Sequence, residues 1–337
     1  MKAREGDLIE TWHGLIFDVK GLVHPRTEVI AFIRYFPDAS GKRRKDSISY
    51  EKVYALQERF DLLAKKFPQY LRYDFVFDEQ LCEVPVRDIE KIYDPIKKLK
   101  QMTSSEELDP LEKKVLNLAE LLKTNAGLAW NSLGVSGSVL ANLHTQSSDI
   151  DIMVYGSENS RKVHLALETM LKDSSLPIRR YSRGELQELF AFRSKDTIVS
   201  FEDFLKTESR KLLQGKFDGT DYFLRFVKDW NEIEEEYGDL TFKNFGYAKI
   251  KTRVIDSSES AFTPCTYGVE ETKPLTGLKG APITEIVSFR GRFCDQAEEG
   301  ETVVARGKIE QVSDNRSHNQ HFRLLIGNKP SDCMILA

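Results

Sequence analysis

Two carboxylates separated by one apolar residue constrain this chain more than any other sequence feature. Asp149-Ile150-Asp151-Ile152 lies in an apolar run typical of a strand, so both carboxylates share one face and both isoleucines the other. Like charges this close repel each other, and burying them unpaired is costly. A divalent cation is the usual solution, and carboxylate oxygens favour Mg²⁺ or Mn²⁺. The pattern therefore predicts a metal site on one face of a strand.

A Gly-Ser pair precedes these carboxylates by ten residues. Gly137 and Ser138 follow a predicted strand and form a tight turn, whose backbone amides and Ser138 hydroxyl can hold phosphate oxygens. A phosphate cradle facing a carboxylate pair is the arrangement that metal-assisted phosphoryl or nucleotidyl transfer requires. The two motifs together predict a nucleotide site.

The segment GVSGSVLANLHTQSSDIDIMVYG, which carries both motifs, resembles the DNA polymerase β-type nucleotidyltransferase superfamily. One position departs from the superfamily pattern, because Ser136 stands where an apolar residue is usual. The whole chain further resembles a set of archaeal predicted nucleotidyltransferases. The resemblance implies transfer of a nucleoside monophosphate from an NTP to an acceptor, with release of pyrophosphate. It implies that Asp149 and Asp151 hold Mg²⁺ or Mn²⁺ and that Gly137 and Ser138 hold the β- and γ-phosphates.

The superfamily normally adds a third carboxylate from a neighbouring strand. Asp221 is the first acid of the next strong predicted strand, residues 220–227, and paired strands lie about 4.8 Å apart. We therefore expect Asp221 to complete the metal site and to help deprotonate the attacking hydroxyl. Asp218 and Glu202 are the alternatives. Arg225, on the same strand as Asp221, is a candidate phosphate contact, although it could equally lie on an exposed strand face.

The pattern of predicted elements indicates an α+β protein in three parts. Residues 1–101 are expected to form an α+β module, residues 102–241 the nucleotidyltransferase domain with a mixed sheet and helices, and residues 242–337 a small OB-like β-barrel. In the first part, residues 53–67 show helical spacing, and a helix over 86–102 is broken near Pro95. Ser104 or Ser105 is expected to cap a helix over 109–127. The last part has short strands at 247–256, 280–295, 300–314 and 321–328.

Composition narrows the class of protein without naming a substrate. The chain has 337 residues, 49 Lys and Arg against 53 Asp and Glu, and no apolar run near the roughly 20 residues of a membrane span. The net charge of -4 argues against a general polyanion-coating protein. Four widely spaced cysteines suit reduced thiols, and the N-terminus lacks a signal-peptide pattern. We expect a cytoplasmic protein without a membrane partner.

The acceptor of the expected transfer is open between RNA, a protein side chain and a small molecule. The alternative to an enzyme is a non-catalytic nucleotide- or RNA-binding protein that kept the fold, which the retained pair of repelling carboxylates disfavours. A third possibility is a small transferase of the toxin–antitoxin type that modifies a partner protein, but the long parts flanking the central domain fit this possibility less well. In the C-terminal part, Phe289, Arg290, Arg292 and Phe293 could contact a single nucleic-acid strand, or the barrel could be purely structural.

Overall fold

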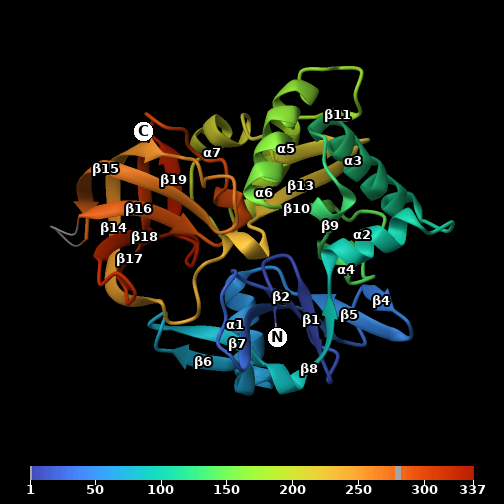
Figure 1. Ribbon diagram of the computed structural model, residues 1–337, viewed down its shortest axis with the longest axis horizontal. Coiled ribbons are helices and arrows are strands. Elements are labelled where there is room, and N and C mark those ends of the chain that lie inside the picture. Colours follow the sequence, from blue (N-terminus) through green and yellow to red (C-terminus); the bar gives the residue numbers. More distant parts are fainter. Residues whose placement is uncertain (1, 278–281) are drawn as a thin grey trace. The chain divides into compact units, whose positions relative to one another are not determined.

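The chain folds as an α+β protein with three sheets in a computed structural model that describes residues 2–277 and 282–337 (Figure 1). Its contacts divide it into two compact units. The first unit comprises the residues up to Arg72, Cys82–Arg180 and Leu212–Glu234, and the second comprises Tyr73–Leu81, Tyr181–Lys211 and Glu235–Ala337. No helix in the described ranges is long and apolar enough to cross a membrane.

The N-terminal sheet is an antiparallel half-barrel with strand order β4-β5-β3-β2-β1-β8, extended by β7 beside β3 and by β6 beside β7. Its strands are β1 (Leu8–Thr11), β2 (Ile16–Val19), β3 (Glu28–Pro37), β4 (Arg43–Lys45), β5 (Ile48–Lys52), β6 (Leu71–Asp74), β7 (Glu79–Pro85) and β8 (Ile89–Tyr93). One face buries Ile9, Phe17 and Ile33 against Leu63 of α1 (Leu56–Lys66). Alternation of buried and polar residues along these strands produces this core.

The prediction of a helix over residues 86–102 is wrong for residues 86–94. Residues 86–88 form a 3₁₀ turn, β8 pairs with β1, and the helix α2 (Pro95–Thr103) begins at the proline. Asp94 caps α2 by accepting hydrogen bonds from the Ile96 and Lys97 amides at 2.9 and 3.1 Å. Proline suits the first helical position, because its missing N–H has no partner there in any case.

The central sheet has strand order β11-β12-β13-β10-β9 and is mixed, with β10 parallel to β13. Its strands are β9 (Leu133–Val135), β10 (Ile150–Tyr155), β11 (Ile178–Arg179), β12 (Gln214–Phe217) and β13 (Thr220–Val227). The helices α3 (Pro110–Ala126) and α5 (Ser157–Met170) pack on each other and on β10 (Figure 1). Asp109, rather than Ser104 or Ser105, caps α3, because its carboxylate reaches the Leu111 and Glu112 amides.

The C-terminal sheet closes on itself. Its strand order is β14-β15-β16-β18-β17-β19, and β14 also pairs with β17, so five strands form a ring. The strands are β14 (Leu240–Asp256), β15 (Cys265–Thr276), β16 (Ile283–Ser288), β17 (Thr302–Asp314), β18 (Gln320–Leu325) and β19 (Cys333–Leu336). One pair in this ring is parallel, because the β17–β18 hairpin brings β18 parallel to β16. Gly280 and Ala281, the expected start of the second strand, lie outside the described residues.

Short and inserted elements complete the fold. The helices α6 (Arg183–Arg193) and α7 (Phe201–Glu208) belong to the same unit as the C-terminal sheet, although they lie between β11 and β12 in the chain. Four further 3₁₀ turns span Pro68–Tyr70, Trp130–Ser132, Trp230–Glu232 and Gly291–Phe293.

The neutral imidazole of His24 makes the N-terminal sheet sensitive to acid. Its Nδ1 accepts a hydrogen bond from the Ile30 amide at 3.2 Å, so Nε2 is the protonated nitrogen and donates to the Ala3 carbonyl at 3.0 Å. Burial lowers the pKa of His24 to about 4 from an ordinary 6.5. The unfolded chain therefore binds the extra proton first, and stability is lost as the pH falls from 6.5 to 4, by up to about 3 kcal/mol.

We therefore expect the melting temperature to fall over this pH range in the wild type and to fall less in His24→Gln. The matched control is His13→Gln, which changes an exposed histidine in the turn between β1 and β2. Equal pH slopes for the wild type and His24→Gln in thermal unfolding would contradict this assignment.

Candidate functional site

A tight turn brings the Gly-Ser pair against the carboxylate strand. β9 ends at Val135, and the chain turns into the four-residue helix α4 (Gly137–Leu140). The Ser136 amide donates to the Asp151 carbonyl at 2.9 Å, which ties the turn to β10. Gly137 has a φ of +61°, and a Cβ at this position would lie 1.9 Å from Oδ2 of Asp151. Only glycine permits this approach between the turn and the carboxylate.

The hydroxyl of Ser138 is a buried polar group without a partner. Ser138 is 2% exposed, and its Oγ makes no hydrogen bond to any of the described residues. Its neighbour Ser136 differs, because its Oγ donates to the Gly6 carbonyl at 2.6 Å. Buried hydroxyls are nearly always satisfied, so an unsatisfied one beside the Gly137 turn indicates a position where a ligand oxygen would fit.

The two aspartates of the motif differ in exposure. Asp149 is exposed directly before β10 begins, and Asp151, within β10, is partly buried beside Gly137. Burial and the charge of Asp149 raise the pKa of Asp151 to about 7, although Arg225, Lys52 and Arg34 act in the opposite direction. The protein alone therefore does not fully compensate the negative charge at Asp151, as expected for a carboxylate that holds a cation.

A β-bulge in the N-terminal sheet directs one cation, Arg34, toward the cavity that Asp151 lines. In the pairing of β2 with β3, Ile16 faces Tyr35 and Phe17 faces Ile33, so Arg34 is the extra residue. Arg34 and the adjacent Tyr35 consequently line the same cavity as Asp151. Bulges re-aim side chains in this way and are frequent next to functional sites.

Lys52, at the end of β5, is a second cation from this sheet. Its ammonium lies 4.6 Å from the ring centre of Tyr54 and 6.0 Å from that of Tyr35. Burial and the positive charge of Arg34 lower the pKa of Lys52 to about 8, against the opposing effect of Asp149. Lys52 is therefore a cation whose charged form is destabilised by burial, close to two carboxylates, and it is available to bind an anionic ligand.

Apolar packing explains why the N-terminal sheet lies beside the site. Leu8, Ile16 and Tyr35 form one buried cluster with Leu140 and Leu143, which follow the Gly-Ser turn. Removing this apolar surface from water stabilises the contact between the two sheets.

The cavity between these elements has a volume of about 40 Å³. That volume fits one or two water-sized groups. Its walls are formed by Leu8, Asp18, Arg34, Tyr35, Ser136, Gly137, Asp151, Ile152, Met153, Phe223 and Arg225.

Arg225 lines this cavity, but its guanidinium is also held from the N-terminal side. It pairs with the fully buried Glu5, which also accepts from Lys20 Nζ at 2.9 Å. Lys20 also pairs with Asp18 at 3.0 Å. Although burial opposes its ionisation, Asp18 has a pKa well below its ordinary value because of Lys20, Arg225 and Arg34.

Four charged residues near the carboxylates are not predictable from the sequence motifs: Glu5, Asp18, Arg34 and Lys52. Arg34 and Lys52 carry no motif, and they lie more than 80 residues before the carboxylates in the chain. A charged residue within the apolar run of residues 29–36 is the one signal that could have suggested Arg34, and Lys52 has no comparable signal.

Asp221 lies on the face of β13 that carries Phe223 and Arg225. The parallel register pairs Ile150 with Tyr222, and extending it by one residue sets Asp221 opposite Asp149. The Asp221 carboxylate is exposed and contacts Lys216 Nζ at 2.9 Å. Of the alternatives, Asp218 pairs with Lys114 at 3.5 Å, and Glu202 belongs to the second unit.

Among the residues that the structure describes, the only three potential metal ligands within 4.8 Å of one another are Asp109, Glu112 and His144. These groups already have partners: Asp109 and Glu112 cap α3, Glu112 pairs with Lys98 at 3.1 Å, and His144 Nε2 lies 2.5 Å from Asp109. No third carboxylate in the described ranges joins Asp149 and Asp151 at that spacing.

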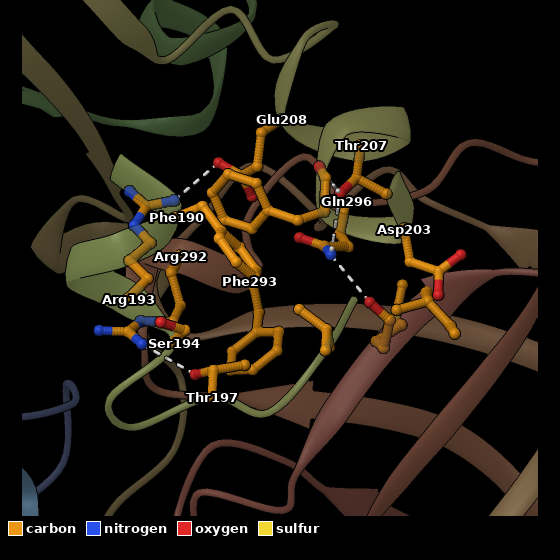
Figure 2. A pocket seen from close by; sticks show the side chains of 14 residues that line it. Phe190, Arg193, Ser194, Thr197, Asp203, Thr207, Glu208, Arg292, Phe293 and Gln296 are labelled. Carbon is orange, nitrogen blue, oxygen red and sulfur yellow. Dashed lines mark hydrogen bonds and ion pairs between the residues drawn. The ribbon is translucent and has the colours of Figure 1, made fainter. Parts of the chain in front are cut away.

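A second cavity lies within the second unit, between α6, α7 and the C-terminal sheet, with a volume of about 30 Å³ (Figure 2). Its charged groups are paired: Arg193 contacts Glu208 at 2.6 Å, and Arg292 donates to Thr197 at 2.8 Å. Phe293 is 2% exposed and therefore inaccessible to a nucleic-acid strand.

The two arginines of the expected SFRGRF contact are also engaged within the second unit. Both Arg290 and Arg292 pair with Asp196. These side chains therefore hold the segment before α7 to the segment between β16 and β17, and the purely structural alternative for them is favoured.

Fold and site together define an α+β protein with a glycine turn packed against a paired-aspartate strand. The chain is 33% identical over 336 residues to uncharacterized protein MJ1086 of Methanocaldococcus jannaschii, covering 97% of this chain and 96% of the relative. The chain belongs to the same family as that archaeal protein. No protein-family model and no solved structure matches the chain.

Proposed function

We propose that the protein is a metal-dependent nucleotidyltransferase that moves a nucleoside monophosphate from an NTP to an acceptor and releases pyrophosphate. The observation that carries this proposal is the contact of Gly137 with Asp151, where no side chain would fit between turn and carboxylate. Such closeness would let the turn bind the phosphates and the carboxylate bind the metal of one ligand. The mixed central sheet, with Asp151 on β10 and Asp149 directly before it, supports a polymerase-β-like nucleotidyltransferase domain.

The residues present fit a divalent cation. Asp149 and Asp151 would hold it, and Asp221 on the neighbouring strand would have to leave Lys216 and move closer to join them as the third carboxylate. The raised pKa of Asp151 is the sign of a carboxylate that lacks positive charge. Mg²⁺ or Mn²⁺ bound there supplies charge neutralisation for the triphosphate and a lowered pKa for the attacking hydroxyl.

The other side chains of the site bind the triphosphate and move a proton. Amides of the Gly137 turn and the unpartnered Ser138 hydroxyl hold the β- and γ-phosphates. Arg34 and Lys52 neutralise their charge from the N-terminal sheet, and Arg225 does so from β13. The acceptor oxygen forms a bond to the α-phosphorus, the bond to pyrophosphate breaks, and Asp221 takes the hydroxyl proton.

We expect Lys52→Met to raise the KM for NTP about tenfold at pH 7, because it removes one cation from the triphosphate. The wild-type KM should rise above pH 8 and approach that of the variant, since Lys52 itself has a pKa of about 8. The control is Lys91→Met, which removes a lysine of the same sheet that also lies over an aromatic ring, 4.5 Å from the centre of Tyr93. A KM that changes equally in both variants would exclude Lys52 from the site.

The C-terminal ring supports an OB-like barrel. Counting its strands from β14, the first pairs with the second and fourth, and the third lies parallel to the fifth. A five-stranded Greek-key barrel of this kind is the architecture of the OB-fold, which accommodates oligonucleotides in many proteins.

The test is label transfer. The protein is incubated with each α-labelled NTP, Mg²⁺ or Mn²⁺, and total RNA or protein, and compared with Asp149→Ala/Asp151→Ala. We expect label transfer by the wild type alone. Transfer by both proteins would refute the assigned site, whereas transfer by neither, with nucleotide bound, would favour the second candidate.

That second candidate is a nucleotide-binding protein without turnover. It is favoured by one observation, the contact of Asp221 with Lys216 rather than with the Asp149–Asp151 pair. Calorimetry combined with the label-transfer assay separates the two candidates, because nucleotide binding without transfer from a reactive NTP under any metal condition is expected only of the second.

A further inference from the structure

Four cations lie side by side on the outer face of the C-terminal sheet. In the antiparallel registers, Lys251 of β14 faces Lys273 of β15, and Lys249 of β14 faces Arg306 of β17. Lys249 and Lys251 alternate along β14 with the buried Ile250, so their side chains point away from the core. We call Lys249, Lys251, Lys273 and Arg306 the cationic face.

Most other cations of the same unit have acidic partners, and Lys195, Lys243 and Lys329 are the exceptions among its described residues. Lys308 pairs with Glu310 at 2.7 Å, and Arg253 pairs with Glu270 at 3.7 Å. No ion pair joins the four residues of the cationic face to an acid in the described part of the chain. Like charges directly opposite each other destabilise a strand pair, so two such pairs on adjacent strands cost folding stability.

Neighbouring groups show that these charges converge. Burial raises the pKa of the Cys333 thiol, and Lys249 and Arg306 are the cations that oppose this increase. Tyr247 precedes Lys249 on β14, and the Lys329 ammonium lies 3.9 Å from the centre of its ring. A fifth cation and an aromatic ring therefore border the cationic face.

We infer that the cationic face binds the phosphates of a single-stranded nucleic acid. Cations two residues apart on one strand are separated by about 6.8 Å, and a flexible chain of phosphates can follow such a row. Cations bordered by an aromatic ring are the combination that binds single strands without sequence preference. The inference goes beyond the proposed transfer reaction and does not depend on it, because the cationic face belongs to the second unit and the nucleotide site to the first.

The experiment measures fluorescence anisotropy of labelled U20 and A20 RNA with the full-length protein. Four phosphate contacts predict that affinity falls about 50-fold between 50 and 200 mM KCl. The variant Lys249→Gln/Lys251→Gln/Lys273→Gln/Arg306→Gln should bind at least tenfold more weakly with little salt dependence. The single variant Lys251→Gln should reduce the slope of log affinity against log salt by about 0.7.

The matched control removes three lysines and one arginine elsewhere, in Lys97→Gln/Arg161→Gln/Lys162→Gln/Lys172→Gln, and should bind RNA like the wild type. Asp149→Ala/Asp151→Ala should also bind RNA normally. The RNA-binding result can therefore be interpreted even if the protein does not catalyse the proposed transfer. Equal losses in the two quadruple variants, no RNA binding by the wild type, or tighter binding to duplex RNA or phosphatidylserine vesicles than to U20 would each overturn the inference. Thermal unfolding verifies that both quadruple variants fold.

Discussion

Gly137→Ala is expected to abolish productive nucleotide binding while leaving the protein folded. Its Cβ would lie 1.9 Å from Oδ2 of Asp151, so either the turn or the carboxylate must move. Both carry the proposed site, and a displacement of about 1 Å in such a site costs on the order of 100-fold in rate. We therefore expect a loss of at least about 100-fold in kcat/KM and a similar loss of metal–nucleotide affinity in calorimetry.

The chain offers a matched control for the backbone strain of this substitution. Gly127, at the end of α3, has a φ of +63°, close to the +61° of Gly137, but a Cβ there would meet nothing within 4 Å. Gly127→Ala should lose about 1 kcal/mol of stability and retain nucleotide binding. If both alanine variants bind nucleotide like the wild type, the approach of the turn to Asp151 has no role in binding.

Asp151→Asn is expected to reduce transfer at least about 1000-fold, or ~4 kcal/mol of transition-state stabilisation. The asparagine keeps the size of the side chain but removes a charge from the pair that holds the cation. Mn²⁺ affinity, measured by electron paramagnetic resonance, should fall in parallel. Metal-free thermal stability should not fall, because the variant no longer ionises a carboxylate whose pKa burial and Asp149 raise.

Two further aspartate variants complete the comparison. Asp173→Asn removes an exposed carboxylate that hydrogen-bonds Ser175, and it should leave transfer unchanged. Asp221→Asn should reduce transfer about 100-fold if Asp221 completes the site. Wild-type transfer by Asp151→Asn would remove the carboxylate pair from the mechanism, and wild-type transfer by Asp221→Asn would remove only the third carboxylate.

Elements with strong local periodicity were predictable from the sequence. The helix α3 follows from apolar residues at every third or fourth position and from Gly127, and β10 follows from its apolar run. Residues 86–94 were not predictable in the same way, because β8 exists through pairing with β1. Similarly, the parallel pairing of β16 with β18 depends on the order of strands in a closed ring.

The sequence by itself determined the carboxylate pair and the glycine turn. Strand alternation places Asp149 and Asp151 on one face, and only glycine tolerates the close turn at position 137; both are properties of a few adjacent residues. Only the tertiary structure decided which cations meet these carboxylates. Arg34 reaches Asp151 because a bulge re-aims it and because apolar packing joins two sheets that are distant in the chain. Burial and charge balance at the site arise from that packing, which no local pattern encodes.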